Sequence, residues 1–334
     1  MNAIIKHIEY YLPERIISNN DLRNEFPAWD VDKIQTKSGV ASRHIAASGE
    51  TALDLSIKAC EKLFVTYDKN EIDGIIYCTQ SPDYIMPSNS FLIQRHFSLS
   101  ENLFCYDFNH ACTGYIYGLM MAHSYIRSGI AKKILLITAD TYSKYINPAD
   151  RSTRVLFGDA AAVSVIEATE KNEGIIDLKV ATYGNGYDKF MIPAGGARLP
   201  QSAETAISNA DLHGNIRSKN DIKMDGMAVW SFINSKVPDQ IRGLLERNQL
   251  TLADIDLVVF HQASLMTLDS LIKILNLDMD KVFINIRELG NTVSASIPIA
   301  LKDAIDSGRI KNNQRILLSG FGVGLAYGTI LINT

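Results

Sequence analysis

Glu71–Ser81 (EIDGIIYCTQS) and Asp254–Ser264 (DIDLVVFHQAS) are the two stretches that decide the fold. Each begins with an acidic residue and Ile-Asp, continues as a short apolar run, and ends in Gln and Ser, at an offset of 183 residues. Self-similarity of this kind is the mark of a repeated structural unit and outweighs local propensity. The sequence therefore predicts two copies of one α/β unit.

The repeat continues downstream, where the two copies carry a thiol and a carboxamide at the same position. In ACTGYIYGLMMAHSYIRSGIAKKILL and GNTVSASIPIALKDAIDSGRIKNNQRILL, Cys112 corresponds to Asn291 at an offset of 179 residues, and a Ser-Gly pair near the end of each segment matches at the same offset. We expect these two side chains to lie at equivalent ends of equivalent helices. The pattern predicts a pseudo-symmetric enzyme.

A third matching pair sets the division of the chain. FGDAAAVSVI, from Phe157, resembles FGVGLAYGTI, from Phe321, at a shorter offset because the first copy carries an extra loop. We expect two similar domains, residues 1–172 and residues 173–334. The first holds the cysteine, and the second holds the asparagine and the histidine of HQAS.

Composition excludes several classes of protein. With 46% hydrophobic and 21% charged residues, the 334-residue chain is typical of a soluble globular protein. A formal net charge of -4 and the lack of a long Lys/Arg block argue against a nucleic-acid partner. The N-terminus has no signal-peptide pattern, and no apolar run is long enough to span a bilayer. We expect a cytoplasmic protein with no membrane association.

Short apolar runs alternate with helical stretches along the chain. The runs IIYCT, ILLIT, AAVSVIEA, LVVFH and ILLSG are typical of strands buried on both faces. Thr51–Phe64 and Val237–Arg247 have the three-and-four apolar spacing of helices. This alternation predicts parallel sheets covered by helices. Residues 195–223 are polar and aperiodic, so we expect a surface loop or lid there.

The cysteines favour chemistry at one position. They are Cys60, Cys78, Cys105 and Cys112, without CxxC spacing or clustered histidines, which argues against a metal site and a disulfide framework. Cys112 opens a predicted helix, where the helix dipole is expected to favour the thiolate. A buried, inert cysteine is the alternative for Cys112, and it is what we expect of the other three.

Two polar residues of the second copy accompany it. His261 follows the buried run LVVF, so it is expected at the carboxyl end of a strand, where sites form in open α/β sheets. A loop histidine without a role is the alternative. Asn291 could simply cap the next helix, but its match to Cys112 favours a shared site.

A glycine-rich turn near the C-terminus, SGFGVGLAYG, precedes a predicted strand and is not a dinucleotide fingerprint, because no helix or acidic residue follows as required. Glycines there would allow a backbone amide to approach a site closely. An oxyanion hole built from that amide and the amide of Cys112 is the expected use.

Taken together, these segments resemble the ketoacyl-ACP synthase III family of the thiolase superfamily. The matching segments, in order, are YLPERIISNNDL, SGVASRHIAA, SPDYIMPS, DFNHACTGYIYGL, RVLFGDAAA, HQAS, GNTVSASIPIAL and GFGVGLAYG. The resemblance implies an α/β thiolase-like fold of two similar halves, each with a mixed five-stranded sheet packed with helices.

The resemblance also implies an acyltransferase that performs a decarboxylative Claisen condensation and gives a 3-oxoacyl product. Cys112 takes the place of the family's nucleophile, and His261 and Asn291 take the places of its His and Asn. The amides of Cys112 and Val323 would form the oxyanion hole, and Phe321 would lie beside the malonyl carboxylate. The substrates implied are an acyl-CoA and malonyl-ACP or malonyl-CoA, with no permanently bound cofactor.

Partners and substrate contacts follow from the same resemblance. It implies a homodimer in which Met86 reaches the partner's acyl tunnel, and an acyl carrier protein as partner. The substrate and coenzyme A contacts implied are Lys37, Arg151, Phe157, Gly226 and Ser264. Several positions depart from the family pattern, since Lys37 replaces an Arg, Lys33 a Trp and Ser264 an Asn, while Met266 replaces a basic residue. A Lys lacks the planar fork of Arg, so these changes leave the substrate identity and pathway open.

Four other functions are compatible with parts of the pattern. An acyltransferase of the same fold could move the acyl group to a hydroxyl or amine without condensation. A papain-like Cys-His-Asn hydrolase lacks support because the C-G-S-C-W signature is missing. A hydroxymethylglutaryl-CoA synthase would need a Glu base, and residues 79–84 contain none. A non-enzymatic partner subunit would not need the intact Cys, His and Asn.

Overall fold

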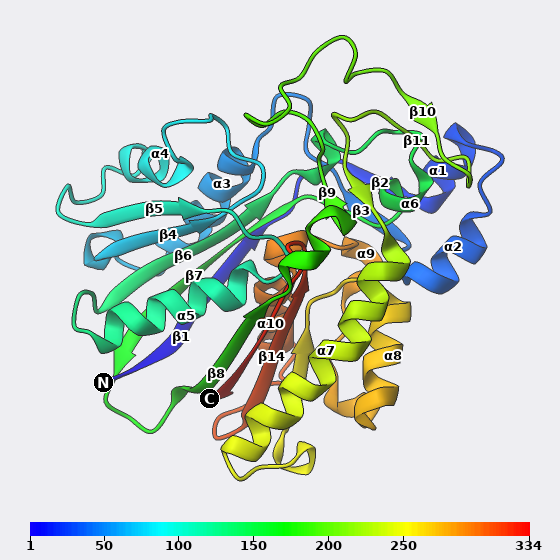
Figure 1. The fold of residues 1–334 in the computed structure, drawn as a ribbon. Coiled ribbons are helices and arrows are strands. Elements are labelled where there is room, and N and C mark those ends of the chain that lie inside the picture. The colour runs from blue at the N-terminus through cyan, green and yellow to red at the C-terminus, as the bar shows by residue number, and fades with distance from the viewer.

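Two sheets with the same order of strand pairing form the framework of the protein (Figure 1). The computed structural model describes residues 1–334. The first sheet has the order β1 (Asn2–Tyr11), β7 (Ala160–Thr169), β6 (Lys133–Asp140), β4 (Gly74–Cys78) and β5 (Phe104–Phe108). The second has the order β8 (Gly174–Thr182), β15 (Ala326–Asn333), β14 (Arg315–Gly322) and β13 (Leu257–Phe260).

The pairing confirms the duplication. In the first sheet β4 and β6 are parallel, and β6–β7 and β7–β1 are antiparallel. In the second, β13 and β14 are parallel, and β14–β15 and β15–β8 are antiparallel. All five strands predicted from apolar runs are present, and the predicted boundary after residue 172 falls in the turn between β7 and β8.

The second sheet differs from the expected five strands. The counterpart of β5 makes only one isolated parallel bridge, between Val258 and Val282, and one further hydrogen bond from the N–H of Phe283 to the carbonyl of Val258. The chain then turns into the short helix α9 (Ile286–Leu289), so a longer ladder cannot form. The second sheet therefore has four strands, and β13 lies at its edge.

Helices cover both sheets and separate them. Between the sheets lie α5 (Gly114–Arg127) and α10 (Ser296–Asp306), whose apolar side chains share one core cluster with residues of β4, β6, β13 and β14. The outer face of the first sheet packs on α3 (Ala52–Phe64) and α4 (Asn89–His96). The outer face of the second packs on α7 (Gly226–Arg247) and α8 (Leu265–Leu275). The structure thus has the arrangement that the sequence predicted, with sheets covered by helices.

Side-chain caps fix where these helices begin. Thr51 and Asp54 form a capping box at α3, so this helix starts where the apolar spacing predicted. The helix expected over Val237–Arg247 is longer, because the side chain of Asp225 accepts the N–H of Ala228 at 3.0 Å and starts α7 at Gly226. None of the helices combines the length and apolar character that crossing a membrane requires.

Shorter elements surround the end of the molecule where the strands' carboxyl ends meet. Residues 195–223, expected to be a loop, contain one small hairpin and the first residue of β12, and otherwise lack regular structure. These shorter elements are β2 (Ile16–Ser18), β3 (Ser42–His44), α1 (Asn19–Glu25), α2 (Val31–Ser38), α6 (Arg151–Arg154), β9 (Phe190–Met191), β10 (Asn209–Ala210), β11 (Ile216–Arg217) and β12 (Lys223–Met224).

Candidate active site

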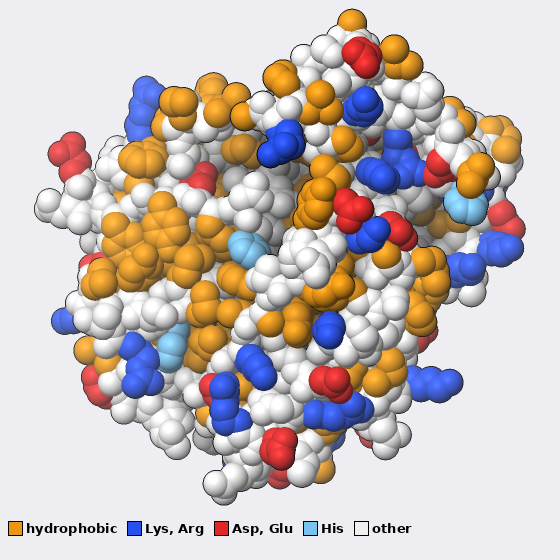
Figure 2. Space-filling view, in the orientation of Figure 1, with side chains coloured by type: hydrophobic (Ala, Val, Ile, Leu, Met, Phe, Trp, Pro, Cys, Tyr) orange, Lys and Arg blue, Asp and Glu red, His pale blue; other side chains and the backbone are white.

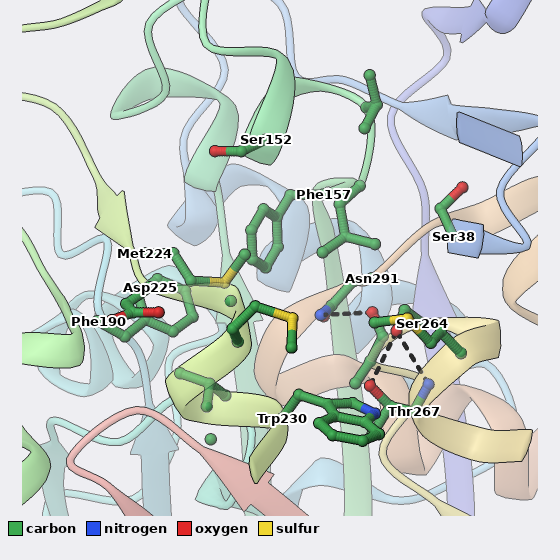
Figure 3. Close-up of a pocket in the computed structure, with 18 of the residues that line it drawn as sticks. Ser38, Ser152, Phe157, Phe190, Met224, Asp225, Trp230, Ser264, Thr267 and Asn291 are labelled. Carbon is green, nitrogen blue, oxygen red and sulfur yellow. Dashed lines mark hydrogen bonds between the residues drawn. The ribbon is translucent and has the colours of Figure 1, made fainter. Parts of the chain in front are cut away.

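A cavity of about 660 Å³ lies where the two halves meet, and most of the predicted site residues line it. Figure 3 shows Phe157, Met224, Trp230 and Asn291 around it. The predicted residues in its wall are Lys37, Cys112, Arg151, Phe157, Gly226, His261, Ser264, Asn291 and Phe321. Val323 lines an adjoining cavity of about 280 Å³ instead. Met86 lies on the surface, with 81% of its area exposed.

Cys112 lies in the turn just before α5 and lines the cavity. Its own backbone N–H and that of Val323 both point at its sulfur. The turn of Val323 can come this close because Gly322 has no side chain, since a Cβ there would lie 2.8 Å from both Cβ and Sγ of Cys112. Both backbone N–H groups of the predicted pair therefore lie beside the thiol.

The expectation of a stabilised thiolate is wrong for the protein without substrate. Burial and the nearby carboxylate of Asp140 raise the pKa of the Cys112 thiol to about 12, and the two amides that lower this pKa do not compensate. The first residue of α5 is Gly114, so the thiol lies before the helix and is fully buried rather than at an open helix end. At neutral pH the thiol is protonated.

Asp140, which sequence reasoning missed, connects the turns around the thiol. It ends β6, is fully buried, and accepts the backbone N–H of Gln80 at 2.8 Å and of Ser294 at 3.3 Å. The Ser294 hydroxyl donates to it as well. Burial raises the pKa of this carboxyl to about 7. A polar residue at the end of the apolar run ILLIT was the signal that could have revealed it.

His261 lies at the carboxyl end of β13, as predicted. Its ring is buried and contacts Phe321 edge to face, with centroids 5.7 Å apart. Nδ1 lies 2.5 Å from Oγ of Ser296, a partner that the sequence did not suggest. Burial lowers the pKa of His261 to about 3, so the ring is neutral at physiological pH.

Asn291 does not cap the next long helix, since α10 begins at Ser296 with Ala295 at its N-cap. Its Oδ1 accepts the N–H of Val293 at 3.0 Å, and its Nδ2 donates to the carbonyl of Ala263 at 3.3 Å (Figure 3). These contacts fix the orientation of the amide. Because Nδ2 has two protons, one stays available to the cavity that Asn291 lines.

The cavity mouth carries basic and apolar side chains. Lys37 and Arg151, expected to contact coenzyme A, line the cavity together with Lys223 and Arg217. Ser264, expected to contact substrate, is the N-cap of α8, and its hydroxyl already bonds to Thr267 Oγ1 at 2.9 Å (Figure 3). Sequence reasoning missed the apolar part of the wall, which contains Met224, Met227, Trp230 and Phe190.

The adjoining cavity contains polar groups that also went unnoticed in the sequence. Tyr142 donates to Oε1 of Gln80, whose Nε2 donates to Asn109 Oδ1 at 2.7 Å. These three residues and Val323 line that cavity, and Phe190 lines both cavities. No group of three or more His, Cys, Asp or Glu side chains in the protein could hold a metal ion.

Comparisons with known proteins show which sequences and structures the chain is similar to. Residues 106–184 match the family model "3-Oxoacyl-[acyl-carrier-protein (ACP)] synthase III", and residues 245–334 match its C-terminal counterpart. A beta-ketoacyl-[acyl-carrier-protein] synthase III of Fusobacterium nucleatum is 35% identical over 98% of this chain and 97% of its own length. One of Campylobacter curvus is 36% identical over 99% and 97%. A crystal structure of a 3-oxoacyl-(acyl-carrier-protein) synthase III superposes with a TM-score of 0.98 at 35% identity, over all of both chains.

Proposed function

The chain belongs to the 3-oxoacyl-[acyl-carrier-protein] synthase III family, and from this premise we propose that it condenses an acyl group held on Cys112 with a malonyl thioester. The observation that carries the proposal is the meeting of four donors or nucleophiles from both halves around one cavity and the smaller cavity that adjoins it. They are the Cys112 thiol, the amide of Val323, the neutral ring of His261 and the side chain of Asn291.

The first step is transfer of the acyl group to the protein. The Cys112 sulfur attacks the carbonyl carbon of an acyl-CoA, a new thioester forms, and the bond to the coenzyme A sulfur breaks. The proton of the thiol leaves with coenzyme A, so charge balances. The oxygen of the attacked carbonyl becomes negative in the transition state, and the N–H groups of Cys112 and Val323, which point at the sulfur, would stabilise that charge.

The second step forms the carbon–carbon bond. A malonyl thioester loses CO₂, and the electron pair of the broken bond makes an enolate whose oxygen needs hydrogen-bond donors. Nδ2 of Asn291 and Nε2 of His261 are suited to that oxygen. The enolate carbon attacks the acyl carbonyl on Cys112, the bond to the Cys112 sulfur breaks, and the released thiolate takes up a proton from water because burial raises the pKa of the thiol to about 12. The product is a 3-oxoacyl thioester.

The cavity mouth suits a long, phosphate-bearing carrier arm. Lys37 and Arg151 supply positive charge at the mouth, and Trp230 and Met224 supply an apolar wall (Figure 3). Relatives of the family are named for an acyl carrier protein. We therefore assign acyl-CoA as the acyl donor and a malonyl group on an acyl carrier protein as the second substrate, with no resident cofactor.

A homodimer completes the proposal. Strand β5, directly before the nucleophile turn, is the edge of its sheet, and Phe104, Tyr106 and Phe108 on it are only partly buried. Figure 2 shows hydrophobic side chains gathered on the face over β5 and the neighbouring part of α5. An exposed apolar edge strand is a surface for pairing with a second chain. Met86, exposed in a single chain, would then meet the partner.

The test of the condensation uses a panel of acyl-CoAs with malonyl-ACP and malonyl-CoA. The 3-oxoacyl product should appear with release of one CO₂ per bond formed, and it should contain the acyl group first found on Cys112. Hydrolysis of the acyl-CoA or transfer to an amine or hydroxyl, without CO₂ release, would contradict the proposal.

The test of the dimer is light scattering of the purified protein. Two chains per particle are expected at micromolar concentration, and Tyr106→Lys should give monomers because it places a charge in the apolar face. A control at Tyr187, which is 67% exposed and remote from β5 in the sequence, should leave the mass unchanged when it is replaced by Lys. A wild-type monomer would contradict the dimer.

A further inference from the structure

Ser296 lies directly behind the ring of His261. Its Oγ is 2.5 Å from Nδ1, and both side chains are buried, with 1% of His261 and 2% of Ser296 exposed. His261 follows β13, and Ser296 is the first residue of α10. The contact therefore links the strand end to the helix start of the second half, and it is made away from water.

The other ring nitrogen faces the reaction space. Nε2 of His261 has no hydrogen bond to the protein. It is also not one of the unpaired polar atoms that are fully buried, so it is accessible from the cavity. His261 lines the cavity, so Nε2 is the ring atom that opens onto it. Which of the two nitrogens carries the ring proton decides whether Nε2 donates or accepts.

The hydroxyl of Ser296 determines which ring nitrogen carries the proton, because the hydroxyl has one proton and one hydrogen-bond partner. Ser296 Oγ makes no hydrogen bond other than the one to Nδ1. If Nδ1 carried the ring proton, the hydroxyl would accept it and leave its own proton buried without an acceptor, which is costly. If the hydroxyl donates, its proton and the lone pair of Nδ1 are both satisfied, and the ring proton is on Nε2.

We propose that Ser296 is the positioning residue that holds His261 in the tautomer with its proton on Nε2. In this tautomer His261 donates a hydrogen bond into the cavity and cannot accept the proton of Cys112. The catalytic consequence of this tautomer rests on the proposed condensation, in which the N–H at Nε2 and the amide of Asn291 donate to the enolate oxygen. Burial lowers the pKa of His261 to about 3, so the ring is neutral and carries a single N–H proton. That proton is on Nε2 when Nδ1 accepts from Ser296.

The first test reads the tautomer without any turnover. The full-length protein, labelled with ¹⁵N-histidine, is compared with Ser296→Ala, and His261→Asn identifies the signals of His261. Wild type should show a pyridine-like Nδ1 and a proton-bearing Nε2, and Ser296→Ala should show a mixture of tautomers. A proton-bearing Nδ1 in wild type would overturn the inference. Since no substrate is used, this result does not depend on the proposed function.

The second test separates the two steps of the reaction. Ser296→Ala should lower kcat for condensation about tenfold, the factor expected for about one hydrogen bond, and leave both the KM for the malonyl thioester and the rate of Cys112 acylation unchanged. Ser296→Thr, which keeps the hydroxyl, should restore condensation and the wild-type tautomer. Equal slowing of both steps, or no slowing of either, would contradict the role. Absence of any 3-oxoacyl product from wild type would instead count against the proposed function alone.

Discussion

The two halves of the molecule use the same pair of positions differently. In the second half the residue after the strand, His261, and the residue before the helix, Asn291, both line the cavity. The corresponding residues of the first half are Cys78 and Cys112, and only Cys112 lines it. Cys78 is fully buried, and its thiol donates to the carbonyl of His110 at 2.9 Å. Under the proposed function, the first half thus supplies the nucleophile, and these two residues of the second half supply hydrogen-bond donors to the malonyl thioester.

Each half also supports the active turn of the other. Strands β6 and β14 are equivalent in the two sheets. Asp140, at the end of β6, binds Ser294 in the turn that follows Asn291. Gly322, at the end of β14, packs against Cys112 in the first half. The site therefore depends on the junction of the halves, and neither half contains a complete site.

The largest expected effect separates the two cysteines of the first half. Cys112→Ala should abolish the acyl adduct and condensation together, because no other thiol lines the cavity. Cys78→Ser is the matched control and should keep the adduct, since Cys78 has no access to substrate. Intact-mass spectrometry after incubation with an acyl-CoA measures both. An adduct on the Cys112→Ala protein would show that a different residue is acylated.

A smaller effect is expected where the second half touches the first. Gly322→Ala would place a Cβ 2.8 Å from Sγ of Cys112 and push the amide of Val323 away from the acyl oxygen. A displacement of about 1 Å at a reacting centre can cost about a hundredfold in rate, so acylation should slow by up to that factor. Gly184→Ala, where a new Cβ would meet no atom within 4 Å, is the control for a harmless added methyl group. Acylation kinetics by quenched flow decide, and an unchanged rate in Gly322→Ala would contradict the role of this contact.

The smallest expected effect is on the pH dependence of stability, and it comes from the buried histidine of the second half, His261. Burial lowers the pKa of His261 to about 3, below its unfolded value near 6.5, so the unfolded state binds a proton that the folded state does not. The free energy of unfolding therefore decreases as the pH falls from about 6.5 towards 3, by about 1.4 kcal/mol per pH unit from this group. Urea unfolding of wild type and His261→Asn from pH 7 to pH 4.5 should show a steeper acid loss in wild type. Parallel curves would mean that His261 titrates normally.

The repeat could be predicted from the sequence, and so could the residues that the repeat places in equivalent positions. Cys112 and Asn291 were predicted because they match at one offset, and His261 because it follows a buried strand; the structure brings all three to one cavity. Partners of these residues were not predictable in the same way. Ser296 and Asp140 meet their partners through contacts between segments 35 and 154 residues apart, which no local pattern encodes.

Two expectations failed because tertiary packing overrides local pattern. The helix-start position suggested a thiolate at Cys112, but burial and the Asp140 carboxylate raise the thiol pKa instead. The family resemblance implied a fifth strand in the second sheet, but the chain turns into α9 after a single bridge at Val282. Val323 was expected as a donor from its backbone alone, and for a backbone group the glycine-rich turn was an adequate signal.

The division of labour between the halves is tested most directly by measuring both half-reactions in Asn291→Ala. The acyl group should load onto Cys112 at nearly the wild-type rate, because both amides at the thiol are retained. Condensation with the malonyl thioester should fall about a hundred- to thousandfold, the effect of losing one oxyanion donor, or about 2.7–4 kcal/mol. If loading falls by as much as condensation does, Asn291 also acts in the acylation step, and the proposed separation between the groups that serve acylation and those that serve condensation is wrong.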